Sequence, residues 1–275
     1  MSKSERRFIS GIHNYCDYWC EHCAFTRRCR IYIDKDPLRE KSDGNPLAQD
    51  ATNAAFWNRL ADKLRETSLF GDKRNWDDTS GATFDDVPDE DWLEREEALQ
   101  EASRRHVLCT IAEEYRKQAG AWLDAADADL KALADELMNE AANPFTQDDI
   151  EERARKIGEM IDVVAWYHTF IQAKVYRAVS GLVRSEEEDE PESDMLAEIR
   201  LHDANGSGKV AWVAIERSIG AWLHLRETLP ERESEILGLL TLLDRLRRGI
   251  QAALPGARTF LRPGFDGETD ENEQS

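Results

Sequence analysis

The chain has 275 residues, which is enough for a large domain with a buried core, and a formal net charge of −20. It contains no apolar stretch of the roughly 18 residues needed to cross a bilayer, so we expect no membrane partner. A surface this acidic also repels nucleic acid, which makes nucleic-acid binding an unfavoured function. We therefore expect a protein partner.

Four of the five cysteines lie close together near the N-terminus, spaced C-x3-C-x2-C-x5-C: Cys16, Cys20, Cys23 and Cys29. Four thiolates can complete the tetrahedral shell of Zn²⁺ or hold a [4Fe–4S] cluster. The spacing predicts a closed four-cysteine metal site in a small N-terminal module, residues 1–45. It leaves both metals open, and either His13 or His22 could replace one cysteine.

The cellular compartment bears on the same cysteines. The first residues lack the apolar segment of a secretory signal, so we expect a cytoplasmic, reducing location. Clustered cysteines bind metals there more often than they form disulfides. The fifth cysteine, Cys109, lies in a helical pattern and is expected to pack in the core. Within the module, Arg30–Ile33 is the most strand-like stretch.

The body, residues 50–262, has helical periodicity almost throughout. A first helix is expected over Ala51–Phe70. Another helical region covers 91–142, with a break or a shift in phase near Gly120. Because such helices carry apolar stripes rather than all-round polarity, they should pack together as a bundle.

The clearest helix of the chain is expected over 147–182, with a long apolar seam spaced by three and four residues. The seam consists of Ile150, Ala154, Ile157, Ile161, Val164, His168, Ile171, Val175, Ala178 and Leu182. An acidic linker is predicted over 185–205, and a further helix over about Gly206 to Leu229. The last helix begins at Pro230, and residues 263–275 form a disordered acidic tail. The predicted fold is thus an all-α bundle of five or six helices attached to the cysteine module.

Four polar residues flank or lie on the apolar stripes and are candidate catalytic groups: Glu114, Asp162, His168 and Glu216. A helical bundle can bring carboxylates and histidine to one interior point and bind a di-metal centre there. The chain contains no Glu-x-x-His, the usual signature of such a centre, so a hydrogen-bonded core histidine is the competing interpretation of His168.

Three functions remain possible on these grounds. The leading hypothesis is an interaction or scaffold protein with structural zinc, whose acidic bundle binds a basic protein partner. The second is an electron-transfer or redox-sensing protein with an iron–sulfur cluster. The third is a metal-dependent oxidative enzyme that uses the four polar residues, so the sequence leaves enzymatic activity undecided.

Overall fold

The computed structural model describes residues 8–34, 90–141, 147–187 and 194–266. These residues contain six α-helices and no strand, which confirms the all-α prediction. They belong to two compact units, one with Ile9–Cys23 and Glu96 onward, the other with Phe8 and Ala24–Arg95, so one of the boundaries falls between Cys23 and Ala24, inside the predicted cysteine module. The helix expected over 51–70 lies outside the described residues.

The strand prediction for Arg30–Ile33 is wrong, because the structure has a short helix there, α1 (Arg30–Asp34). It follows a 3-10 turn, η2 (Thr26–Arg28). The amide of Ile33 donates to the carbonyl of Cys29 over 3.2 Å, which is the i to i−4 bond of an α-helix. Strand propensity spans only about 1 kcal/mol and is easily outweighed over so short a stretch.

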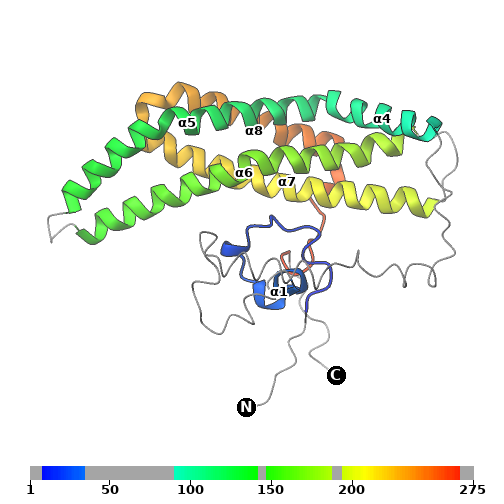
Figure 1. Ribbon diagram of the computed structural model, residues 1–275, viewed down its shortest axis with the longest axis horizontal. Coiled ribbons are helices and arrows are strands. Elements are labelled where there is room, and N and C mark those ends of the chain that lie inside the picture. The colour runs from blue at the N-terminus through cyan, green and yellow to red at the C-terminus, as the bar shows by residue number, and fades with distance from the viewer. Residues whose placement is uncertain (1–7, 35–89, 142–146, 188–193, 267–275) are drawn as a thin grey trace, which may run out of the picture. The chain divides into compact units, whose positions relative to one another are not determined.

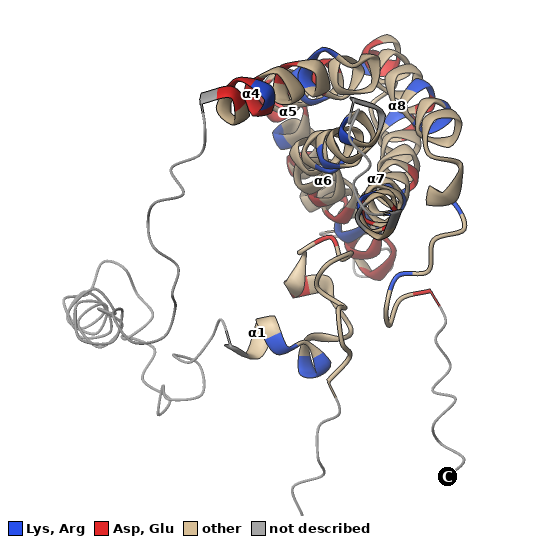
Figure 2. Cartoon of the chain, turned by 90° about the vertical axis from the view of Figure 1, so that its right-hand side faces the viewer, with Lys and Arg blue, Asp and Glu red and all other residues tan. Residues whose placement is uncertain are grey.

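Four long helices of the second unit form a bundle around one apolar core (Figure 2). They are α5 (Val107–Ala141), α6 (Gln147–Glu187), α7 (Asp194–Thr228) and α8 (Glu233–Ala253). Seen end-on, charged residues of both signs lie on the outside of the four helices (Figure 2). A shorter helix, α4 (Glu90–Arg105), precedes α5. The predicted helical bundle is therefore confirmed.

The helices α6 and α7 run antiparallel, because Arg177 of α6 pairs with Asp203 at 2.9 Å, whereas Tyr167, earlier in α6, accepts a hydrogen bond from Arg217, later in α7. Gly181 of α6 meets Ala204 of α7. A Cβ atom added at Gly181 would lie 2.9 Å from the Ala204 side chain, so glycine is needed for this close approach.

The predicted break near Gly120 is wrong, because α5 continues through that residue and the chain bends at His106 instead. The His106 ring accepts a hydrogen bond from the amide of Leu108 over 3.2 Å. The ring thus satisfies one of the amides that a new helix leaves without an intrahelical partner. Gly120 lies instead against the ring of His168.

The predicted helix over 147–182 is confirmed, but the acidic linker over 185–205 is mostly wrong. Residues 185–187 continue α6, and residues 194–205 form the first three turns of α7, while residues 188–193 lie outside the described residues. Glutamate is a good helix former, and an aspartate at the start of a helix suits its dipole, so acidic composition alone did not indicate a loop.

The predicted helix start at Gly206 is wrong, because this glycine lies inside α7. A Cβ atom there would come within 2.2 Å of the Tyr15 ring, so the glycine lets the N-terminal segment pack against the helix. The predicted tail also begins later than residue 263, because the half-buried Asp266 carboxylate bonds the Arg262 guanidinium at 2.9 Å. No helix among the described residues combines the length and apolar character that crossing a membrane requires.

Candidate functional site

The cysteines divide between the two units. Cys16, Cys20 and Cys23 lie in the unit that contains the bundle, and Cys29 lies in the other. All four are partly exposed, and none of the five cysteines, which all fall in the described ranges, forms a disulfide. The thiols are therefore chemically available as ligands, because a metal binds the unoxidised sulfur.

Residues 9–23, which we call the thiol segment, follow an irregular path with one short 3-10 turn at Cys20–His22. The amide of Cys23 bonds the carbonyl of Cys20 over 3.2 Å and so closes the turn between these two cysteines. Tyr18 has a φ of +57°, a left-handed conformation that costs a residue with a side chain about 1 kcal/mol or more.

Asp17 anchors the thiol segment to the bundle. Its carboxylate accepts hydrogen bonds from the Tyr167 hydroxyl at 2.7 Å and from the Arg217 guanidinium at 2.6 Å. Arg217 also donates to the Tyr167 oxygen, and the Asp17 carbonyl accepts from the Trp166 indole at 3.1 Å. One aspartate next to a cysteine is thus bound to both α6 and α7.

Aromatic packing reinforces this anchor. The Trp19 ring stacks on Trp166 with centroids 5.4 Å apart and an angle of 14° between the planes. It also meets Tyr167 edge-on at 5.7 Å. Burial raises the pKa of Tyr167, and its hydrogen bond to the Asp17 carboxylate raises it further, so the hydroxyl keeps its proton and donates.

A second set of contacts holds the start of the thiol segment. The Tyr15 hydroxyl donates to Asp203 over 3.4 Å, and its ring meets Phe260 edge-on at 4.8 Å. Burial lowers the pKa of Lys174, whose ammonium lies 5.2 Å from the centre of the Tyr18 ring. Burial also raises the pKa of the Cys16 thiol. The segment is therefore packed on the bundle through Tyr15, Asp17, Tyr18 and Trp19.

The thiols do not form a ready-made coordination shell. The described residues contain no group of three or more His, Cys, Asp or Glu side chains placed to hold one metal ion. Ligand sets of this kind commonly assemble only as the metal binds, because the metal offsets the repulsion between thiolates. Four cysteines match the number of thiolates that a Zn²⁺ ion or a [4Fe–4S] cluster takes.

The four polar residues proposed for a site inside the bundle are not brought together in its interior. Glu114, Asp162 and Glu216 are exposed, and Glu216 pairs with Arg247 at 3.1 Å. Only about a third of the circumference of each helix faces the core, and these carboxylates lie beside that apolar stripe. His168 is half-buried, and its Nδ1 lies 2.8 Å from the Ala165 carbonyl, as expected of a structural histidine.

The anchor residues Asp17, Tyr167 and Arg217 were not found by sequence reasoning. They are separated by 150 and 200 positions, so no local pattern links them. Tyr167 gave a weak signal, since it is the neighbour of the seam residue His168 in the clearest helix, and the structure buries it fully. A buried hydroxyl requires a polar partner, although the sequence does not identify it.

The buried thiol of Cys109 is expected to make the free energy of unfolding depend on pH. Burial raises the pKa of its thiol from 9.0 to about 11. A raised pKa in the folded state stabilises the fold below pH 9, and that contribution is lost as the pH rises toward 11. We expect the wild type to lose up to about 2 kcal/mol more stability over this range than Cys109→Ala, measured by urea unfolding at each pH. Parallel pH profiles for the two proteins would contradict this.

The chain was also compared with known proteins. No family model matches it, and the searches of curated proteins and of solved structures return no match either. The function must therefore be inferred from the residues themselves.

Proposed function

We propose that the protein binds a metal through Cys16, Cys20, Cys23 and Cys29, and that the bundle is the scaffold that holds the thiol segment. The observation that carries the proposal is the anchor at Asp17, where two long helices bind the residue directly after the first cysteine. A core of this size is not needed to form a four-cysteine metal site, so its role is to position that site for a partner.

Zinc and a [4Fe–4S] cluster are both compatible with four thiolates, and they imply different roles. A structural zinc site makes the protein an interaction scaffold, which is the function we favour. An iron–sulfur cluster makes it an electron-transfer or redox-sensing protein.

The test is metal analysis with an absorption spectrum on the full chain, purified anaerobically with the thiols reduced. We expect about one zinc per chain and no visible colour. A broad visible band with about four irons and four sulfides per chain would assign the cluster instead. Protein without a stoichiometric metal would refute metal binding.

The chain offers a matched pair of variants for the same measurement. Cys23→Ala removes one predicted ligand, and we expect it to lose most of the metal. Cys109→Ala removes a thiol that is buried in the core of the bundle and should keep the wild-type metal content. Equal losses in both variants would indicate that metal content follows overall folding, which contradicts the proposed ligand set.

A further inference from the structure

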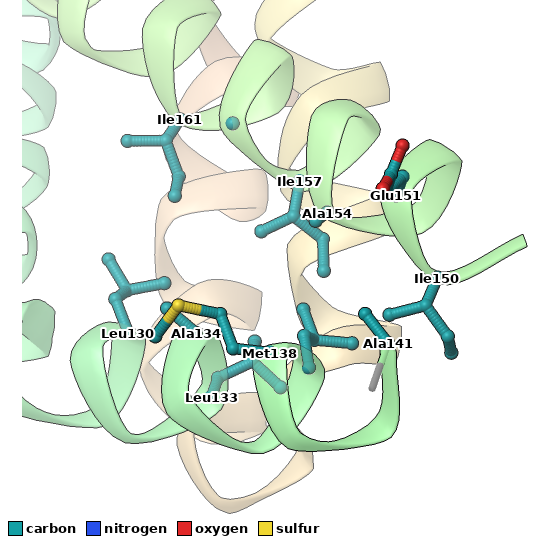
Figure 3. Close-up of a pocket in the computed structure, with 12 residues that line it drawn as sticks. Leu130, Leu133, Ala134, Met138, Ala141, Ile150, Glu151, Ala154, Ile157 and Ile161 are labelled. Atoms are coloured by element: carbon teal, nitrogen blue, oxygen red, sulfur yellow. The ribbon is translucent and has the colours of Figure 1, made fainter. Parts of the chain in front are cut away.

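An apolar groove opens between the end of α5 and the start of α6 (Figure 3). Its volume is about 320 Å³, and among the residues that the structure describes Glu151 is the only charged one that lines it. The apolar lining comes from both helices and includes Leu130, Leu133, Leu137, Ile150, Ile157 and Ile161. Several of these residues belong to the predicted seam of α6. The seam therefore continues into the groove, beyond the part of α6 that the other helices of the bundle cover.

The groove lies beyond the reach of the other two helices. At the turn between α7 and α8, the Arg232 guanidinium bonds Asp129 at 2.6 Å and the Ala125 carbonyl at 2.8 Å. This turn therefore meets α5 just before the groove begins at Leu130, and the hairpin of α5 and α6 extends past it (Figure 1). A Cβ atom added at Gly158 would find no atom within 4 Å, so the groove has unfilled space.

The charge around the groove limits what can occupy it. Residues 130–141 and 147–161 carry eight carboxylates and four basic side chains. A second copy of the chain would bring the same negative excess, and an anionic lipid surface would also be repelled. The groove is therefore complementary to an apolar surface edged by positive charge.

We infer that this groove binds an amphipathic helix of a partner protein, with an apolar face and Lys or Arg along both edges. The groove follows α5 from Leu130 to Ala141, about 17 Å at 1.5 Å per residue, which matches three turns of a bound helix. Met138 is 65% exposed at its edge, and its flexible thioether can adapt to different side chains. This goes beyond the metal proposal, because no cysteine contributes to the groove.

The experiment titrates the full chain into a fluorescently labelled synthetic helix of about four turns, with a Leu face and Lys edges, followed by anisotropy. A second peptide keeps the Leu face and carries Glu edges. We expect the Lys peptide to bind, the Glu peptide to bind at least about tenfold more weakly, and added salt to reduce the difference.

Gly158→Leu adds an apolar side chain to the groove at a position where a Cβ atom would meet nothing within 4 Å, and it replaces a helix-interior glycine by a better helix former, so it should fold. We expect it to weaken binding of the Lys peptide by about tenfold or more. Gly220→Leu on α7, where an added Cβ atom also meets nothing, is the matched control and should bind as the wild type does.

Three outcomes would overturn the inference. They are that neither peptide binds, that both peptides bind with equal affinity, and that the two glycine variants bind the Lys peptide with the same affinity. A dimer seen by sedimentation and abolished by Gly158→Leu would assign the groove to a second copy and would also refute it. The measurement repeated on Cys23→Ala should give the same affinity, which separates this inference from the metal proposal.

Discussion

Replacing Trp222 by alanine should cost about 3–5 kcal/mol of unfolding free energy, the range found for large buried aromatics. Trp222 is fully buried on α7 and meets Trp122 of α5 edge-on at 4.8 Å. Its indole also donates to the hydroxyl of Tyr115 over 3.0 Å. The substitution therefore opens a cavity at the centre of the bundle and leaves a buried hydroxyl without its donor.

Urea unfolding followed by circular dichroism measures this loss. The neighbouring residue provides the control, since Leu223 is 40% exposed and Leu223→Ala should cost less than about 1 kcal/mol. Trp222→Phe keeps most of the apolar volume but removes the indole donor, and it should fall between the two. A similar cost for Trp222→Ala and Leu223→Ala would show that Trp222 is not central to the core.

Periodicity predicted the parts of the fold where local pattern and tertiary packing agree. The seam of α6 predicted a helix, and Ile157, Val164, Ile171 and Val175 on that seam are buried. Residues spaced by three and four along a helix lie on one of its faces, and that face is buried only when other helices pack against it. The pattern therefore predicts a bundle. The sequence identified these residues as core because burial is the one role that requires such spacing.

The helix boundaries that were predicted from composition rather than from periodicity were wrong. Gly206 suggested a helix start, although the glycine is required by the ring of Tyr15, a residue 191 positions away. The acidic composition before it suggested a linker that reaches residue 205, although residues 194–205 belong to α7. In both places the cause is tertiary or electrostatic and leaves no local signature.

Of the candidate site, the sequence allowed only the proposed ligands to be predicted. The four cysteines are recognisable by spacing, whereas their anchor joins Asp17 to residues of α6 and α7 that are far away in the chain. Of the four polar residues expected in the bundle interior, only His168 is even half-buried. A carboxylate beside an apolar stripe reaches solvent at little cost, and its spacing along the helix is the same whether it points to solvent or to the core.

Asp17→Ala should release the thiol segment while leaving the bundle folded. The variant removes one acceptor of two strong hydrogen bonds, and Arg217 and Tyr167 lose their shared partner. Because Arg217 is half-exposed and water replaces part of its interaction, we expect a loss of about 2 kcal/mol. Amides of residues 9–23 should then exchange with solvent roughly 30-fold faster.

Hydrogen exchange with mass spectrometry reports this segment and the bundle separately. Exchange in α7 and α8 should stay close to that of the wild type, since the core residues there do not touch Asp17. Glu113→Ala is the control, because it removes a half-buried carboxylate whose ion pairs, among the described residues, are with Arg116 and Lys117 on its own helix. Unchanged exchange in residues 9–23 of Asp17→Ala would mean that the other contacts of the segment, the stack of Trp19 on Trp166 and those of Tyr15, hold it without Asp17.

The same variant connects the scaffold to the metal. If the bundle positions the thiol segment for metal binding, Asp17→Ala should lower metal affinity although every cysteine remains. The mechanism is entropic, because a detached segment must be ordered at the expense of binding free energy. Competition with a chelator measures the change, and we expect it to match the cost found by exchange. Full metal affinity in a detached segment would show that the cysteines bind metal without the bundle, and that the bundle serves the partner alone.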